Sequence, residues 1–145
     1  MTTKAILVDT GAWYALADQS DRFNREAITT YKQIFKDFQK VVTTNLIISE
    51  SYTLIRKGLG HNAGIDFLKN LGASPRIIKV FSDLEIEGQA EEILRRHKDQ
   101  DFSYTDAVSF ACMTRLNINQ AFTFDSHFRT AGFDVLPGIK YLFNK

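Results

Sequence analysis

The chain is poor in cysteine and carries almost no net charge, and each shortage excludes a class of protein. Cys112 is the single cysteine among 145 residues, so an internal disulfide is excluded and a reducing compartment is indicated. A lone cysteine of this kind is typically a small, buried, apolar residue. Because the net charge is +1, no global basic field marks the chain as a nucleic-acid binder, and any such surface must be local.

Long apolar runs and zinc-ligand spacing are also missing. No apolar run approaches the length of a membrane span, and the N-terminus lacks the hydrophobic region of a signal peptide, so we expect a cytoplasmic protein with no membrane partner. His61, His97 and His127 are scattered without the spacing of zinc ligands. No linker, repeat or low-complexity tract divides the chain, and we therefore expect a single domain over residues 1–145.

What the chain does contain is a regular alternation of strand-like and helix-like segments. Strands are expected at residues 5–8, 41–44, 76–81 and 120–124, with a fifth, edge strand at 133–136. Helices are expected at residues 11–17, 22–39, 46–57, 62–71, 83–98, 104–116 and 127–131. This alternation predicts an α/β domain with a mainly parallel central sheet of four to five strands.

Three of the helix starts are assigned from capping residues. Asn45 is expected to cap the helix after the second strand. Ser82 with Glu85 has the spacing of a capping box, and Ser103 is expected to open the helix before the fourth strand.

Four carboxylates are predicted to lie at one edge of this sheet. Asp9 and Asp125 directly follow apolar strands, and ligands of open α/β sheets bind outside the carboxyl ends of the strands. Glu50 lies just over one turn into the helix that starts from the same edge. Asp106 lies in the first turn of the helix before the fourth strand, and it joins the others if that helix runs antiparallel to the strand.

Two of these acids also have a structural interpretation. Asp9 could cap the helix that follows it. The segment from Ser103 to Asp106 has capping-box spacing, and an acid in the first turn suits the helix dipole. Glu50 lies too deep in its helix to act as a cap, and on a helical wheel it falls between Leu46 and Leu54. Charges are rarely found on an apolar face unless they are paired or bind a metal, so Glu50 favours a site.

A converging group of carboxylates needs a cation, because the bare charges would repel one another. Hard divalent cations such as Mg²⁺ or Mn²⁺ favour oxygen ligands. One such ion can activate water, and a pair can also stabilise the leaving oxygen of a phosphoryl transfer. The pattern therefore predicts metal-dependent phosphoryl-transfer chemistry without a protein nucleophile.

Four short segments add a family resemblance. They read VDTGA at 8–12, NLIISE at 45–50, FSYTDA at 102–107 and TFDSHF at 123–128. In this order and spacing they resemble the PIN-domain ribonucleases, and in particular the VapC-like toxins of bacterial toxin–antitoxin pairs. The resemblance covers nearly the whole chain and implies a PIN-like fold, with helices on both faces of the sheet.

The resemblance also implies a site, a substrate and partners. One or two Mg²⁺ or Mn²⁺ ions are implied, for hydrolysis of RNA phosphodiester bonds, with the ligands Asp9, Glu50, Asp106 and Asp125. Thr10, and more weakly Ser126, would set the metal geometry through their hydroxyls. A homodimer and an antitoxin that covers the site are implied as well. Asp101 could supply a further carboxylate, but a solvated turn residue is the stronger expectation.

Some basic and aromatic residues are candidates for RNA contacts. Arg129, close after Asp125, and Arg56, near the end of its helix, could bind phosphate. Trp13 follows the first acid and could stack on a base, although a place in the core or a dimer interface is an equal expectation.

Other functions remain as alternatives to a toxin endoribonuclease. An aspartyl-phosphate phosphatase would need a second aspartate where Gly11 stands, and a receiver domain would need a lysine where Ser126 stands. A PIN-type RNA-processing nuclease that is not a toxin, or a PIN-like module that binds RNA or protein without catalysis, would keep the same fold.

Overall fold

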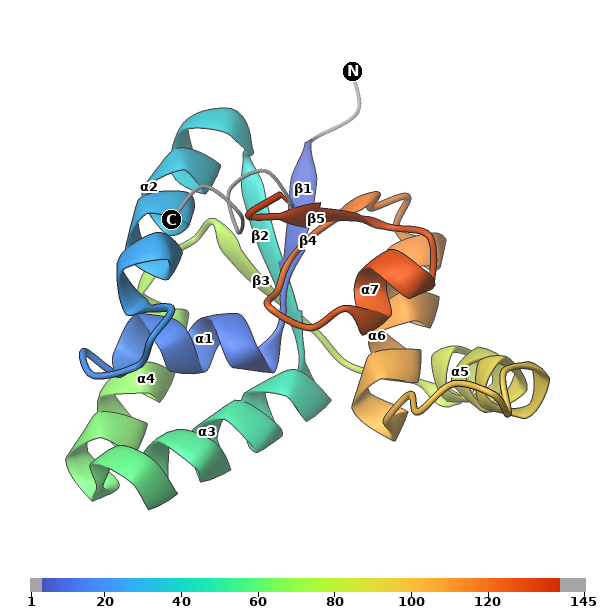
Figure 1. Cartoon of the computed structure of the whole chain (residues 1–145), viewed down its shortest axis with the longest axis horizontal. Helices are drawn as coiled ribbons and strands as arrows, with labels where there is room; N and C mark the ends of the chain where they lie inside the picture. Colours follow the sequence, from blue (N-terminus) through green and yellow to red (C-terminus); the bar gives the residue numbers. More distant parts are fainter. Residues whose placement is uncertain (1–3, 139–145) are drawn as a thin grey trace.

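A computed structural model describes residues 4–138, which form a five-stranded parallel sheet covered by helices (Figure 1). The strands are β1 (Ala5–Val8), β2 (Lys40–Thr44), β3 (Ile77–Val80), β4 (Gln120–Phe122) and β5 (Asp134–Leu136), in the order β3-β2-β1-β4-β5. The predicted parallel sheet and its fifth, edge strand are therefore confirmed. The ends of the predicted domain, residues 1 and 145, lie outside the described residues.

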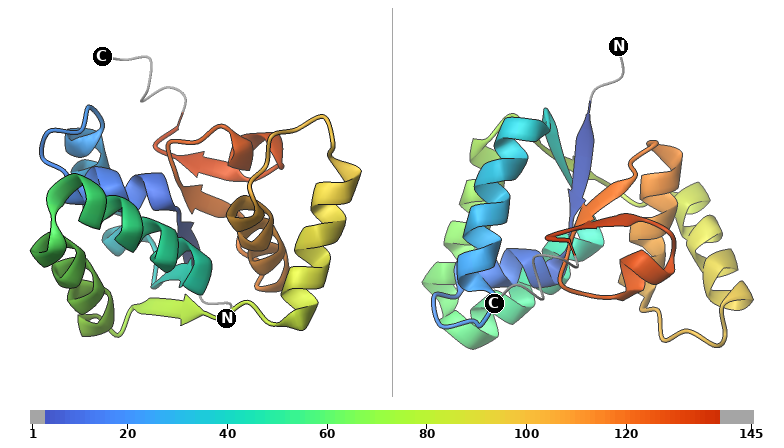
Figure 2. Two further views of the ribbon diagram at one scale, coloured as in Figure 1. Left: turned by 90° about the horizontal axis from the view of Figure 1, so that it is seen from below. Right: turned by 45° about the horizontal axis from the view of Figure 1, so that its top comes forward.

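Helices cover both faces of this sheet, as predicted. They are α1 (Thr10–Ala17), α2 (Asn24–Asp37), α3 (Asn45–Leu59), α4 (His61–Ala73), α5 (Leu84–Arg96), α6 (Tyr104–Arg115) and α7 (His127–Thr130). Helices α1–α4 lie on one side of the sheet, and α5–α7 lie on the other (Figure 2). No helix within residues 4–138 combines the length and the apolar character needed to cross a bilayer.

The core is centred on β1, which is paired on both sides and covered on both faces. Ile6, Leu7 and Val8 are completely buried, as expected for a central parallel strand. Aromatic residues fill much of the surrounding space, and Phe122 and Phe128 are among the largest fully buried side chains. Such rings contribute large apolar areas to the core, so burying them contributes much of the stability.

The helix after β2 is capped by a different residue from the one predicted. Thr44 occupies the N-cap position of α3, and its Oγ1 accepts a hydrogen bond from the Ile47 N–H at 3.1 Å. Asn45 is the first helical residue, and its side-chain oxygen accepts from the Ser82 N–H at 2.9 Å. The prediction of an Asn45 cap was wrong because this side chain binds the loop after β3.

The predicted capping box at the start of α5 was also wrong. Asp83 is the N-cap, and its Oδ1 accepts from the Ile86 N–H at 2.9 Å. The Ser82 hydroxyl instead donates to Glu87, and Glu85 lies in the first turn without a capping role. An aspartate at the next position provided a competing cap of the same kind.

Candidate active site

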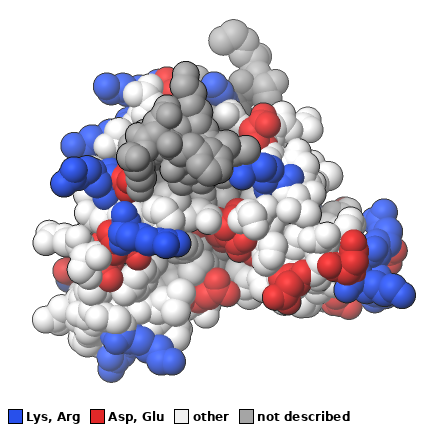
Figure 3. Space-filling model, viewed as in Figure 1, with Lys and Arg blue, Asp and Glu red and all other residues white. Residues whose placement is uncertain are grey.

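The carboxyl ends of β1 and β4, the second and third turns of α3 and the first turn of α6 surround a cleft of about 720 Å³. Carboxylates from six positions line it: Asp9, Asp21, Glu50, Asp101, Asp106 and Asp125. No lysine or arginine of the described chain lines it. Figure 3 shows acidic side chains around a hollow near the centre of this face. All four predicted acids are thus brought to one cleft.

Asp9 lies at the base of the cleft, with only 6% of its surface exposed. It occupies the N-cap position of α1, but its side chain makes no capping hydrogen bond. Its Oδ2 instead accepts from the Thr123 hydroxyl at 3.0 Å. Burial raises the pKa of Asp9 from 3.8 to about 7, because desolvation outweighs the hydrogen bonds that lower it. The Asp9 carboxylate therefore does not cap α1, and capping does not account for an acid at this position.

Asp106 has a structural role and a place in the cleft at the same time. It forms a complete capping box with Ser103, whose N–H donates to Asp106 Oδ2 at 3.0 Å. The same oxygen contacts His127 Nδ1 at 2.9 Å. Because Oδ2 carries both contacts, the carboxylate is held in one orientation, and its other oxygen is left for further ligands.

Asp125 begins a tight turn that carries His127 into the cleft. The strand β4 ends at Phe122, two residues earlier than predicted, and the Asp125 N–H donates to Thr123 Oγ1 at 3.0 Å. Such a bond between a threonine side chain and the backbone draws the chain out of the extended conformation. Asp125 Oδ1 in turn accepts from the His127 N–H at 2.9 Å.

His127 belongs to the acidic cluster, which sequence reasoning missed. One ligand atom each from Asp106, Asp125 and His127 lie within 4.8 Å of one another. Burial alone would lower the pKa of His127, but the hydrogen bond to Asp106 and the neighbouring negative charges raise it. The search for zinc spacing discarded this histidine, although its place two residues after Asp125 indicated it.

Glu50 lines the cleft from α3, but not from an apolar face. The residue is exposed, and its neighbour Leu54 keeps 44% of its surface exposed at the cleft. The buried face of α3 carries Ile47 and Ile55 instead. The prediction that Glu50 sits on a buried apolar stripe was wrong, because a helical wheel does not show which face meets the core.

The hydroxyl of Thr10 has no hydrogen-bond partner in the described part of the chain. Thr10 lines the cleft with 5% of its surface exposed, and its Oγ1 has no hydrogen-bond partner within residues 4–138. A buried, unsatisfied hydroxyl is costly, so it indicates a ligand of the cleft. Ser126 lies exposed among the lining residues.

The remaining predicted contacts lie apart from the cleft or change their role. Trp13 is 5% exposed, and its Nε1 donates to Thr43 Oγ1 at 3.3 Å. The prediction that Trp13 stacks on a base was therefore wrong, and its expected place in the core is confirmed. Arg56 and Arg129 are exposed but do not line the cleft. Asp101 is exposed, as expected for a solvated residue, and it lines the cleft.

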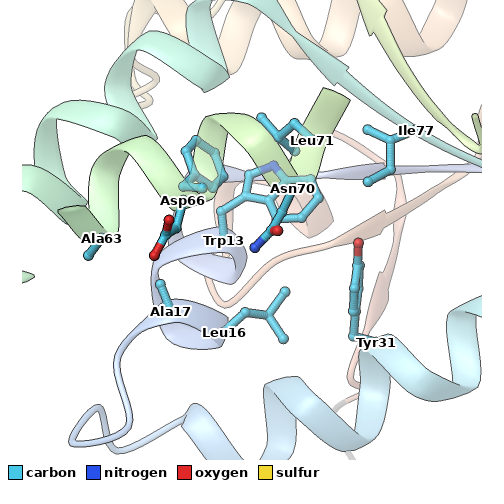
Figure 4. Close-up of a pocket in the computed structure, with 10 residues that line it drawn as sticks. Trp13, Leu16, Ala17, Tyr31, Ala63, Asp66, Asn70, Leu71 and Ile77 are labelled. Atoms are coloured by element: carbon cyan, nitrogen blue, oxygen red, sulfur yellow. The ribbon is translucent and has the colours of Figure 1, made fainter. Parts of the chain in front are cut away.

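A second cavity, of about 400 Å³, lies between α1, α2, α4 and β3. Its walls are mainly apolar, with Trp13, Tyr31 and Leu71 around it (Figure 4). Its polar lining consists mainly of Asp66 and Asn70. Because it lacks a group of acids or nucleophiles, the acidic cleft is the better candidate for catalysis.

The geometry agrees with comparisons to known proteins. The PIN domain profile matches residues 6–134. The 23S rRNA-specific endonuclease VapC20 of two Mycobacterium tuberculosis strains, CDC 1551 and H37Rv, is 36% identical over 130 residues, which cover 88% of this chain and 95% of the relative. The crystal structure of M. tuberculosis VapC20, a sarcin–ricin loop cleaving toxin, has a TM-score of 0.79 at 32% identity, over 88% of this chain and 95% of that one.

A more distant structure shares the fold alone. FitAcB from Neisseria gonorrhoeae has a TM-score of 0.63 at 16% identity, over 90% of this chain and 95% of that one. The family profile covers residues 6–134, which include all four acids, and VapC20 matches 88% of the chain. The chain therefore belongs to the PIN-domain family.

Proposed function

We propose that this protein is a metal-dependent endoribonuclease that hydrolyses RNA phosphodiester bonds as the toxin of a type II toxin–antitoxin system. The observation that carries the proposal is the cleft, which is lined by carboxylates from six positions and by no lysine or arginine of the described chain. The relative VapC20, of which the match covers 95%, is itself an endonuclease. The match to VapC20, whose structure is that of a toxin, favours a toxin over a processing nuclease, and the presence of all four acids in the cleft counts against a non-catalytic module.

The residues present fit a divalent cation. The buried hydroxyl of Thr10 has no partner among residues 4–138, and burial raises the pKa of Asp9 to about 7, so a nearby cation would stabilise its charged form. Oxygen donors of this kind favour Mg²⁺ or Mn²⁺. We assign the ligands of one or two ions to Asp9, Glu50, Asp106 and Asp125. Such an ion would supply Lewis-acid activation of the phosphodiester and of the attacking water.

The protein's other polar groups would orient these ligands. The Thr123 hydroxyl fixes Asp9 through its 3.0 Å hydrogen bond, and His127 fixes Asp106 through its 2.9 Å contact. Thr10 would offer its hydroxyl to the bound ion or its water, and Ser126 would contribute from the rim. Outer partners of this kind typically raise metal affinity by about 10- to 100-fold.

The substrate and partners follow from the same relative. VapC20 acts on 23S rRNA, and its structure is that of a toxin cleaving the sarcin–ricin loop. We infer that this protein also cleaves structured RNA in the cytoplasm, and that an antitoxin covers the cleft. Homodimerisation and phosphate contacts by Arg56 and Arg129 are part of the proposal.

The test is RNA cleavage by the purified protein with Mg²⁺, Mn²⁺ or EDTA. Two substrates are needed, a hairpin with the sarcin–ricin loop sequence and a scrambled single strand. We expect cuts in the hairpin that require metal. Cleavage that persists in EDTA would contradict metal dependence. A protein that binds Mn²⁺ by calorimetry but cuts neither RNA would support the non-catalytic module.

Glu50→Gln should lower cleavage by at least about tenfold while leaving the melting temperature unchanged. The change removes one negative charge from the cleft, and Glu50 is exposed and too deep in α3 to act as a cap. Rates of hairpin cleavage and thermal unfolding are the measurements. Glu85→Gln, an exposed glutamate outside the cleft, is the matched control. Full activity of Glu50→Gln would remove this residue from the site.

His127→Gln should weaken Mn²⁺ binding by about 10- to 100-fold, because Asp106 loses the partner that orients it. Isothermal calorimetry measures the affinity directly, without depending on cleavage. His61→Gln, at an exposed histidine outside the cleft, is the control. Unchanged affinity in His127→Gln would mean that this histidine only packs beside the cluster.

A further inference from the structure

The acidic cleft poses an electrostatic problem for the proposed substrate. RNA phosphates are negative, and proteins bind them chiefly through arginine and lysine. No such residue of the described chain lines the cleft, and Arg56 and Arg129 lie outside its walls. A lysine or arginine of residues 4–138 that guides RNA to the site must therefore lie at the rim.

One arginine at that rim packs on an aromatic ring that is itself stacked on a second ring. The guanidinium carbon of Arg22 lies 4.5 Å from the centre of the Phe23 ring. Phe23 is stacked on Phe124, with ring centres 4.5 Å apart and planes inclined by 7°. Both rings line the cleft, and Phe124 directly precedes Asp125. The arginine is thus connected to the acidic cluster through a rigid stack.

Other cations on aromatic rings lie away from the site. Lys4, Arg76 and Lys79 contact Phe rings that do not line the cleft. Arg22 is exposed, and none of the ion pairs among residues 4–138 includes it. Figure 3 shows basic side chains directly beside the acidic hollow. The Arg22 charge is therefore available to a ligand.

We propose that Arg22, packed on the ring of Phe23, binds an unpaired nucleotide of the RNA at the mouth of the cleft. A guanidinium packed on a ring keeps an outer face on which a base can stack, and its N–H groups can donate to phosphate. The stack limits the side-chain freedom that binding would otherwise remove, which favours affinity. This subsite rests on the proposed function, because it presupposes an RNA substrate.

The test measures RNA binding in an Asp106→Asn background, where cleavage does not consume the probe. Fluorescence anisotropy with a labelled single-stranded RNA gives the affinity. Arg22→Gln should weaken binding by about tenfold, within the range of one stacked base. It should also reduce the slope of log affinity against log salt by about 0.7, the value for one phosphate contact on a single strand. Arg22→Lys should keep the salt slope but lose part of the affinity, because lysine keeps the charge without the planar face.

Arg25→Gln is the matched control, since Arg25 is an exposed arginine of the same segment and contacts no ring of the described chain. It should bind RNA like the parent. The subsite would be overturned if Arg22→Gln bound RNA as tightly as the parent, or if Arg22→Gln and Arg25→Gln lost the same amount of RNA affinity. Either result would leave the nuclease proposal intact as long as the parent cuts RNA. A parent that neither binds nor cuts RNA would overturn both.

Discussion

Asp106→Asn should reduce RNA cleavage by more than about 100-fold without unfolding the protein. Loss of an outer partner of a metal ligand typically costs about 10- to 100-fold, and loss of a ligand charge should cost more. The fold should survive, because an asparagine oxygen can still accept the Ser103 N–H that Asp106 Oδ2 now accepts. Cleavage of the sarcin–ricin hairpin in Mn²⁺, beside circular dichroism of both proteins, is the measurement.

Ser103→Ala separates the two roles of Asp106. This change removes the hydroxyl that accepts the Asp106 N–H, but it leaves the carboxylate in place. Loss of an N-cap costs about 1 kcal/mol of stability. We therefore expect a lower melting temperature and cleavage within a few-fold of the parent. If Asp106→Asn and Ser103→Ala lose stability alike and both keep cleavage, Asp106 would be a capping residue only.

The edge at which the acids meet could be predicted because it depends on local sequence and on the parallel sheet. Asp9 follows β1 directly, and Glu50 lies early in the helix after β2. Parallel strands place all such positions at one edge. The placement of Asp106 needed the direction of α6 as well, which the sequence left open because α5 and α6 follow one another without a strand between them.

The hydrogen bonds that orient the acids could not be predicted in this way. The Thr123 hydroxyl reaches Asp9 across 114 positions of sequence, and His127 reaches Asp106 across 21. Such pairs form only when β4 lies beside β1 and the following turn folds back. No spacing rule contains that information, so Thr123 and His127 were missed.

The apolar-face interpretation of Glu50 and the base-stacking alternative for Trp13 failed for a common reason. Periodicity shows that a helix has an apolar face, but it does not show whether that face meets the core or a cleft. Trp13 follows the first acid, yet its ring packs at 5.8 Å from both Tyr31 and Phe67 in the core. Phe23 and Phe124 provide the aromatic surface at the cleft instead.

In EDTA, the free energy of unfolding should fall as the pH rises from about 4 to about 7, through the titration of Asp9. The pKa of Asp9 is about 7 in the folded protein, compared with the ordinary value of 3.8 that applies in the unfolded chain, so the folded state binds the proton more tightly. Between these values the folded protein holds more protons than the unfolded chain, and stability therefore decreases with pH. The full difference between these two pKa values corresponds to a loss on the order of 4 kcal/mol in the free energy of unfolding above pH 7.

Asp9→Asn isolates this contribution, because an amide does not titrate and keeps an oxygen for the Thr123 hydroxyl. Urea unfolding at pH 4 and pH 8 should show a smaller loss of stability in Asp9→Asn than in the parent. Asp99→Asn, an exposed aspartate, should follow the parent.

Adding Mn²⁺ at pH 8 should raise the free energy of unfolding of the parent but not of Asp9→Asn. A ligand that binds only the folded state stabilises it by mass action, by about 2.7 kcal/mol at a concentration one hundred times its Kd. The buried charge of Asp9 would then lower the free energy of unfolding only in the metal-free protein. Equal pH dependence of the parent and Asp9→Asn in EDTA would show that Asp9 stays ionised without metal. Another cation in the cleft would then have to offset its charge, and among residues 4–138 the only candidate lining it is His127.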